Sequence, residues 1–171
     1  MRAMSISSWS RAMTGSRQQS DGRYCLVPVV QPDDWAAYHA IRKAELFASR
    51  HPDVAYDTQH PDETRLNHFP LLLKYNGAAI GTVRVDLRGS DDAVIRLVAI
   101  ARAKQGKGHG RILGEKIEEF ARMKNVSRLL VNAAPDATGY YERLGYQPDS
   151  WAPSELIGIA SQSVQMSKVI R

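Results

Sequence analysis

The stretch KQGKGHGRILGEKIEEFARMKN, residues 104–125, places three glycines within five positions and then continues as a charged amphipathic segment. Ordering a glycine in place of an alanine costs roughly 0.5–1 kcal/mol, so three of them indicate a sharp backbone turn or a close approach to the backbone. Apolar side chains recur at helical spacing over about 109–124, and Asn125 suits the end of that helix. With the apolar run that ends near Ala101, the stretch predicts a strand, a tight turn and a long helix.

The glycine turn fits one of three phosphate-binding patterns. A P-loop needs Gly-Lys followed by Ser or Thr, but Gly108 follows the only Gly-Lys pair. A dinucleotide-binding fingerprint needs a glycine where Arg111 stands. The remaining pattern is a set of backbone N–H groups at a helix N-terminus, which binds anions such as diphosphates, with positive charge added by Lys104, Lys107 and Arg111. From the loop alone, a purely structural role in a tight turn is an equal alternative.

Elsewhere the chain alternates strand and helix patterns in the order β-α-β-β-β-α-β-α-β. Strands are expected over 24–30, 69–75, 78–88, 93–100, 127–134 and 154–170, and further helices over about 34–49 and 136–145. Asp33 is the expected N-cap of the first helix. Asn76-Gly77 between two apolar runs is a strong hairpin signal, so the central strands run antiparallel. The polar stretch 50–68 is expected to be a long loop of the kind that often serves function.

The composition is that of one soluble globular domain. A chain of 171 residues is long enough for one full hydrophobic core and short for two. Residues 1–23 carry +3 of the net charge of +5, which leaves +2 for the remaining 148 residues. Such a near-balanced surface argues against a nucleic-acid partner. No apolar run approaches the roughly 18 residues of a membrane-spanning helix, so no membrane partner is expected.

The first 22 residues differ in composition from the rest. They are rich in Ser and Arg with almost no acid, which predicts a disordered basic extension, with an organellar transit peptide as the alternative. Residues 23–171 are expected to form a single domain. Its one cysteine, Cys25, excludes an internal disulfide, argues for a reducing, cytoplasmic compartment, and is expected to be a buried structural thiol.

Two motifs together carry a family resemblance. In LVAIARAKQGKGHGRIL, Gln105, Gly108 and Gly110 fill the pattern Gln or Arg, two residues, Gly, one residue, Gly or Ala. About 30 residues downstream, ATGYYERLGYQP has an alanine before an aromatic-Tyr-Glu-basic-x-Gly-aromatic run. Both motifs, at this spacing and in this strand order, resemble the GNAT N-acetyltransferase superfamily. The resemblance covers residues 24 to about 170. It implies a GNAT-type acyl-CoA N-acyltransferase fold, with a mixed, mostly antiparallel sheet flanked by helices.

The resemblance also implies that acetyl-CoA is the co-substrate and that a primary amine attacks its thioester directly in a ternary complex. The cofactor's diphosphate would lie on the backbone amides of Gln105, Gly106, Lys107, Gly108, His109, Gly110 and Arg111. The main chain of Val98 and Ile100 would contact the pantetheine, and an amide near Val98 would polarise the acetyl carbonyl. Tyr141 would protonate the leaving thiolate, as a phenol with a pKa near 10 can do, whereas Tyr140 is expected in the core.

One position departs from the family pattern. Many relatives carry an asparagine seven positions before the tyrosine, where its amide contacts the pantetheine, but Ala134 stands there. Asn132, at the end of the same strand, is the candidate substitute. The general base is not evident, and deprotonation through water is as plausible as any of the candidates, which are Glu45, Asp86, His60 and His68.

The acceptor stays open between a small metabolite, a peptide N-terminus, a lysine and an antibiotic. Thr82, Arg84 and Asp86 alternate onto one strand face. An arginine such as Arg96 at the acceptor cleft would favour a carboxylate-bearing substrate, with a structural Arg–Asp pair as the alternative.

The five histidines lack metal-ligand spacing, so no metal is expected. A non-catalytic acyl-CoA sensor and a nucleic-acid-binding domain are the competing functions, and a homodimer is compatible with the superfamily.

Overall fold

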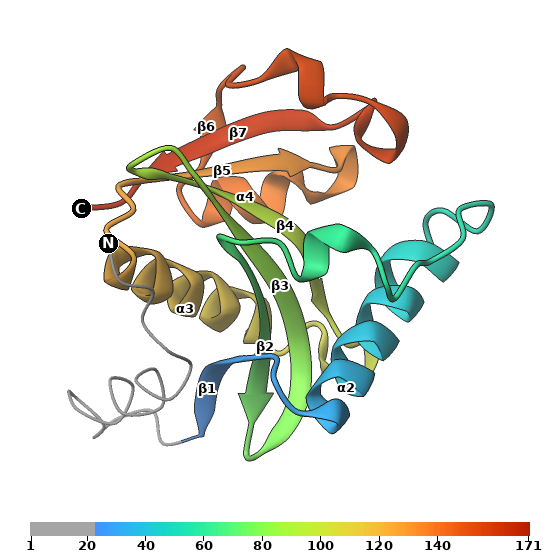
Figure 1. Ribbon diagram of the computed structural model, residues 1–171. Coiled ribbons are helices and arrows are strands. Elements are labelled where there is room, and N and C mark those ends of the chain that lie inside the picture. Colours follow the sequence, from blue (N-terminus) through green and yellow to red (C-terminus); the bar gives the residue numbers. More distant parts are fainter. Residues whose placement is uncertain (1–22) are drawn as a thin grey trace.

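The protein is built around a seven-stranded sheet with the strand order β1-β2-β3-β4-β5-β7-β6 (Figure 1). The computed structural model describes residues 23–171, so the predicted disordered extension, residues 1–22, lies outside the described residues. The strands are β1 (Tyr24–Pro28), β2 (His68–Tyr75), β3 (Ala78–Arg88), β4 (Asp92–Ile100), β5 (Arg128–Ala133), β6 (Gln147–Pro148) and β7 (Val164–Val169). Only β4 and β5 pair in parallel, and the other pairs are antiparallel. The predicted mixed, mostly antiparallel α/β fold is confirmed.

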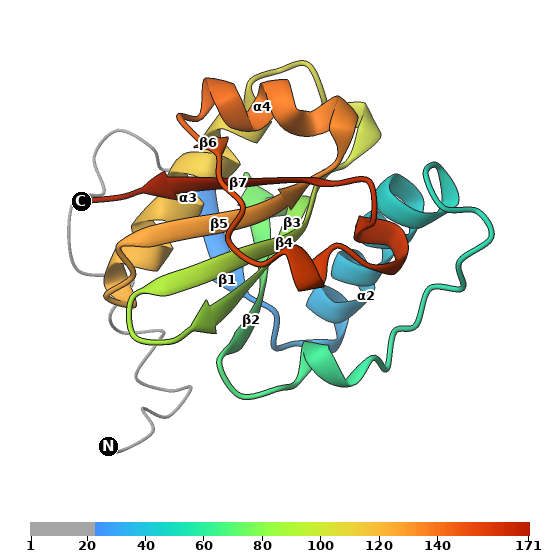
Figure 2. The same cartoon turned by 90° about the horizontal axis from the view of Figure 1, so that it is seen from above.

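Helices cover both faces of the sheet, and the alternation of side chains along β2 shows how. Leu71 and Leu73 point into the larger apolar cluster, which includes Leu113 of α3 (His109–Met123) and side chains of α4 (Thr138–Arg143). Leu72, between them, packs against Tyr38 of α2 (Pro32–Arg42) in the smaller cluster. Figure 2 shows α2 on one side of the sheet and α3 with α4 on the other. The period-two pattern of the strand therefore builds two cores at once.

The hairpin between β2 and β3 forms where the sequence predicts it. Asn76 and Gly77 both have positive φ, 51° and 82°, and the ladder closes at the pair Tyr75↔Ala78. Two consecutive positive φ values are what a two-residue turn needs to match the twist of the flanking strands. The hairpin holds β2 and β3 in register beside β4, the strand that carries the site described below.

The C-terminal region corrects the prediction of one strand over 154–170. Only Val164–Val169 forms β7, and the preceding residues form the 3-10 turns Pro153–Glu155 and Gly158–Ala160. Proline cannot donate to a ladder, and Gly158 has a φ of +56°, so this segment leaves the sheet. The short helix α4 also begins later than predicted, because Asp136 lies in a 3-10 turn before it.

Two predictions near the N-terminal end are also wrong. Cys25 is exposed, because it alternates with the buried Leu26 on an edge strand and so faces away from the core. The first helix begins at Pro32, with Gln31 rather than Asp33 in the N-cap position. Proline suits the first helical position, where its missing N–H is no loss.

Candidate functional site

The sheet opens between β4 and β5. Their parallel ladder runs only from Asp92↔Arg128 to Ile95↔Val131, although β4 continues to Ile100. Beyond Ile95, the edge of β4 that faces β5 has no strand partner among residues 23–171. The two strands that enclose the opening are otherwise held firmly, because β4 pairs with β3 on its far side and β5 pairs with β7.

A bulge in β4 lies at this opening. The pairs Thr82↔Ala99 and Arg84↔Arg96 leave one residue of β3 opposite two of β4, Leu97 and Val98. Leu97 has a φ of +54°, a conformation that costs a non-glycine residue about 1–3 kcal/mol and is concentrated at functional sites. The bulge turns the main chain of β4 toward the opening instead of toward a neighbouring strand.

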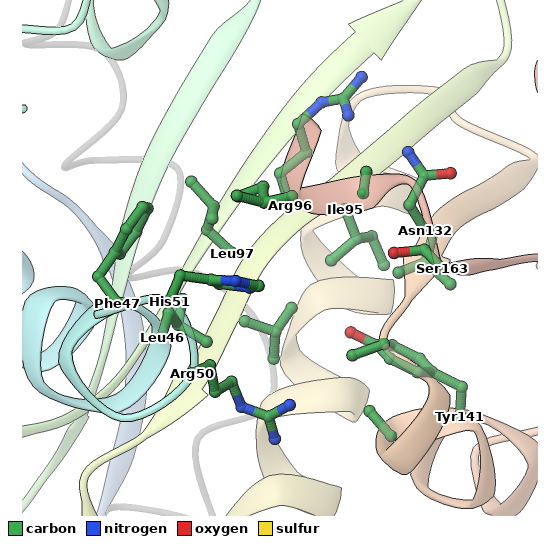
Figure 3. A pocket seen from close by; sticks show the side chains of 16 residues that line it. Leu46, Phe47, Arg50, His51, Ile95, Arg96, Leu97, Asn132, Tyr141 and Ser163 are labelled. Atoms are coloured by element: carbon green, nitrogen blue, oxygen red, sulfur yellow. The ribbon is translucent and has the colours of Figure 1, made fainter. Parts of the chain in front are cut away.

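A cavity of about 330 Å³ occupies the opening (Figure 3). Its walls come from the turn after α2, from the bulged part of β4, from the end of β5, from α4 and from the connection between β6 and β7. Val98 belongs to the β4 wall and Tyr141 to the α4 wall. Segments that are far apart in the sequence therefore meet at one hollow beside the bulge.

The glycine loop lies between the end of β4 and α3, and glycine is needed at its positions for two different physical reasons. Gly106 and Gly108 have φ values of +69° and +82°, with open space where a Cβ would stand, so the backbone conformation alone requires glycine. Gly110 is helical, but a Cβ there would lie 3.2 Å from Cε2 of Tyr140. The close approach predicted for this glycine is therefore made by a side chain of the protein itself.

The same loop presents unpaired backbone donors. Within the described chain, the N–H groups of residues 106–111 have no hydrogen-bond partner, whereas those of Lys104 and Gln105 bond to Ala101 and Arg102. No side chain of the described residues caps α3 at Gly108, and the first turn of α3 holds no acid. These donors stand at the positive end of a 15-residue helix. The arrangement fits an anionic group such as a diphosphate.

The side chains of this loop form contacts with other groups of the protein. The His109 ring is buried against Tyr24, whose hydroxyl lies 2.8 Å from His109 Nδ1. Lys107 Nζ donates to the carbonyl of Ala103, and Arg111 forms an exposed pair with Glu115 at 2.6 Å. An anion at this helix end would therefore meet backbone amides first.

Gln105 ties the loop to the end of β4. Its Nε2 donates to the carbonyl oxygen of Ile100 at 2.8 Å and lies 3.5 Å from Glu45 Oε2. The other oxygen of Glu45 accepts the N–H of Arg102 at 2.9 Å. Glu45, a sequence candidate for the general base, thus anchors the glycine loop and does not line the cavity.

The two adjacent tyrosines of α4 have different surroundings. The hydroxyl of Tyr140 donates to the carbonyl of Gly110 at 2.8 Å, and burial raises the pKa of Tyr140 to about 12. The ring of Tyr141 is buried between Tyr140 and Tyr146, and its hydroxyl points into the cavity (Figure 3). In the described part of the chain that hydroxyl has no hydrogen-bond partner, and burial raises its pKa well above the usual range. Tyr141 therefore offers the cavity a neutral phenol O–H.

Asn132 and Ala134 both line the cavity on the β5 side. The amide of Asn132 is engaged, since its oxygen accepts from Gln165 Nε2 at 3.0 Å and its nitrogen donates to Glu155 at 3.4 Å. The same Gln165 Nε2 donates to the carbonyl of Ala152 at 2.8 Å. Asn132 therefore fastens β5 to the connection between β6 and β7.

A buried ionic network lies under the loop 50–68, on the α2 side of the sheet. Arg84 pairs with Asp86 through two bonds of 2.8 and 3.0 Å and with Glu63 at 3.1 Å. Arg42 also pairs with Glu63, at 2.8 Å, and Arg96 joins Asp86 at 2.9 Å. The structure contains the Arg–Asp pairing, and Arg96 also lines the cavity, so it does not decide between the two alternatives from the sequence.

The remaining sequence candidates for the base lie outside the cavity lining. Asp86 belongs to the ionic network, His68 Nδ1 lies 2.8 Å from the carbonyl oxygen of Asp62, and His60 stands exposed in the loop. Side chains that sequence reasoning missed line the cavity instead, among them Phe47 and His51. The only signal for His51 was the length and polarity of the stretch 50–68.

Two negative findings apply to residues 23–171. No helix there is long and apolar enough to cross a membrane. No three side chains of His, Cys, Asp or Glu gather there in a way that could hold a metal ion.

The sequence matches the model of the acetyltransferase (GNAT) family over residues 34–146, which is more than half of its 171 residues. The chain belongs to the acetyltransferase (GNAT) family. The matched range includes the bulged strand, the glycine loop and Tyr141. The family resemblance read from the two sequence motifs is confirmed.

Individual members of the GNAT family show the same relationship at low sequence identity. A Bacillus subtilis (strain 168) protein, provisionally named an acetyltransferase, is 26% identical over 95 residues, which are 56% of this chain and 60% of that protein. A Lactobacillus plantarum crystal structure, provisionally named an N-acetyltransferase, gives a TM-score of 0.71 at 20% identity, covering 88% of this chain and 100% of that one. The structure of an aminoglycoside 6'-N-acetyltransferase complexed with coenzyme A gives a TM-score of 0.67 at 8% identity, covering 86% of this chain and 97% of that one. Such structural matches establish a shared fold.

Proposed function

We propose that this protein is an acetyl-CoA-dependent N-acetyltransferase in which a primary amine attacks the thioester directly, within a ternary complex. Membership of the GNAT family supports the class of reaction. The unpaired amides of the glycine loop and the opening in the sheet support an elongated acyl-CoA as the co-substrate. The acceptor can be a small molecule or a peptide amine.

The co-substrate would extend along the backbone from the N-terminus of α3 to the opening beside β4. The amides from Gly106 to Arg111 would hold the diphosphate at the N-terminus of α3, because the N–H of Gln105 is already bonded to the carbonyl of Arg102. The unpaired edge of β4 would bind the pantetheine through the main chain of Val98 and the N–H of Ile100, since the carbonyl of Ile100 already accepts from Gln105 Nε2. An amide near Val98 would polarise the acetyl carbonyl. Because these contacts use main-chain groups, the bulge and the positive φ values matter more than the side chains. Asn132 would border this path rather than bind in it, since its amide is already paired.

Tyr141 is the residue that we propose as the proton donor. Its raised pKa keeps the phenol protonated, and its hydroxyl faces the cavity free of internal partners among the described residues. A phenol placed beside the sulfur would donate a proton to the leaving thiolate, a kind of assistance that typically contributes 10²–10⁴-fold. This free hydroxyl in the cavity is the observation that carries the proposal.

The test compares Tyr141→Phe with Tyr140→Phe, two variants that each remove one phenol oxygen from neighbouring positions. CoA release from acetyl-CoA would be measured over a panel of amino acids, polyamines, aminoglycosides and peptides, and CoA binding by calorimetry. We expect Tyr141→Phe to lose roughly 10²-fold or more in kcat with CoA affinity kept, and Tyr140→Phe to lose far less. A wild-type protein that binds CoA and releases none with any amine would favour the acyl-CoA sensor instead.

A further inference from the structure

His51 enters the cavity from the wall opposite Tyr141. Helix α2 continues as a π-helical turn, Lys43–Ala48, a feature found frequently at functional sites. Just beyond it, the N–H of His51 donates to the carbonyl of Phe47 at 2.7 Å, and its own carbonyl accepts the N–H of Val54 at 2.9 Å. The backbone at His51 is thus held on both sides, and Figure 3 shows the imidazole pointing into the cavity.

Six polar side chains line the cavity, and half of them are engaged. Arg50 pairs with Asp136 at 2.8 Å, Arg96 with Asp86 and Glu155, and Asn132 with Gln165. The other three make no side-chain hydrogen bond to any residue of the described chain, and they are His51, Tyr141 and Ser163. These three groups can bond to a substrate without first breaking an internal contact.

An acceptor amine needs a base here, and the lining restricts the choice. Most primary amines are cations near neutral pH, and the lone pair that attacks the thioester is free only after a proton leaves. Among residues 23–171, no carboxylate lines the cavity. Guanidinium groups such as Arg50 and Arg96 have no acceptor site, and the buried Tyr141 phenol keeps its proton. An imidazole is the side chain suited to take a proton near neutrality.

We infer that His51 is the general base that accepts the proton of the acceptor ammonium; this inference rests on the proposed function. One ammonium proton passes to the free imidazole nitrogen and then to solvent. The amine nitrogen forms its bond to the acetyl carbon, and the C–S bond breaks with its electron pair on sulfur. The thiolate takes the proton of Tyr141, and the phenolate regains one from the nitrogen that has become an amide. The net products are the amide, CoA and one proton.

The experiment uses two small acceptors that differ in basicity. Propylamine is a cation at neutral pH and needs a base, whereas hydroxylamine is largely neutral and does not. Release of CoA from acetyl-CoA would be followed by chromatography with the full-length wild type, with His51→Gln, and with His60→Gln as the matched control from the same loop. Rates without enzyme are subtracted, because hydroxylamine also reacts with thioesters unaided.

We expect His51→Gln to lose roughly 10²-fold in kcat with propylamine and to keep nearly full activity with hydroxylamine, while His60→Gln keeps both. An equal loss with both amines would overturn the base role, because a damaged site treats them alike. Full activity of His51→Gln with propylamine would overturn it as well. If wild type turns over neither amine nor any of the wider panel, the proposed function itself fails, a result separate from failure of the base.

Discussion

The hydroxyl of Tyr140 donates a hydrogen bond of 2.8 Å to the carbonyl oxygen of Gly110 and so ties α4 to the first turn of α3. The tyrosine ring lies so close to the helix that a Cβ at residue 110 would stand 3.2 Å from Cε2. Tyr141 is the next residue along α4, so the same contact helps to fix its hydroxyl in the cavity. The last glycine of the loop thus couples the anion-binding helix end to the proposed proton donor.

Gly110→Ala is therefore expected to disturb both elements. The added methyl group requires the Tyr140 ring to give way by a few tenths of an ångström, which the hydrogen bond from its hydroxyl to Gly110 resists, and overpacking of this kind typically costs about 1–3 kcal/mol. We expect a lower free energy of unfolding in urea and a lower kcat, because α4 would shift with its tyrosines. Gly139→Ala is the control within α4, where the new Cβ meets only Arg143 Nη1 at 3.5 Å. That variant should be neutral or slightly stabilising, and an equal loss in both variants would contradict the packing argument.

Gly108→Ala tests the loop conformation itself. Residue 108 has a φ of +82° with open space around its Cβ position, so the substitution adds backbone strain of about 1–2 kcal/mol and no clash. Gly89, at the β3–β4 turn, has a φ of +64° and equally open space, which makes Gly89→Ala a matched control. We expect similar losses of stability in the two variants. Only Gly108→Ala should weaken CoA binding, measured by calorimetry. Strain at residue 108 changes the orientation of the N–H groups at the N-terminus of α3, whereas strain at residue 89 does not.

The features that sequence predicted best are set by short-range chemistry. Asn76-Gly77 gives the hairpin because both residues tolerate positive φ, and the loop glycines give the turn before α3 for the same reason. Tyr141 could be named because a local motif surrounds it. In each case the neighbours in sequence decide the conformation, so the pattern alone carries the information.

The features that sequence missed depend on contacts between distant segments. His51 reaches the cavity only because the π-helical turn after α2 brings a loop residue against β4 and faces it toward α4. Cys25 is exposed because β1 is an edge strand, which depends on the strand order of the whole sheet. The end of the β4–β5 ladder has no local signal either, since the paired residues, such as Ile95 and Val131, lie 36 positions apart in the sequence. Long-range pairing therefore decides the shape of the site.

The carboxylate of Glu63 pairs with two buried arginines, so its removal should lower the free energy of unfolding strongly. Its carboxylate accepts from Arg42 at 2.8 Å and from Arg84 at 3.1 Å, and all three side chains are buried. Breaking a buried pair by removing one partner typically costs about 3–5 kcal/mol. We expect Glu63→Gln to lower the urea midpoint strongly, whereas Glu115→Gln, which breaks an exposed pair with Arg111, should cost about 1 kcal/mol or less.

Asp92 and Arg128 pair where β4 and β5 begin, with Arg128 Nε and Nη2 donating to the carboxylate at 2.9 and 2.6 Å. The hydrogen bonds from Arg128 lower the pKa of Asp92 below its ordinary value. A carboxyl whose pKa is lower in the folded than in the unfolded chain stabilises the fold above the unfolded pKa, near 3.9. That stabilisation is lost as the pH falls through the folded pKa.

We therefore expect the urea midpoint of the wild type to fall more steeply below about pH 4 than that of Asp92→Asn, which has no carboxyl to protonate there. The pair is partly exposed, so the difference should be about 1 kcal/mol or less. Arg128→Met provides the second arm of a double-mutant cycle, and the double variant should lose little more than either single one, since both remove the same pair. Additive losses would instead mean that each side chain stabilises the strand ends independently.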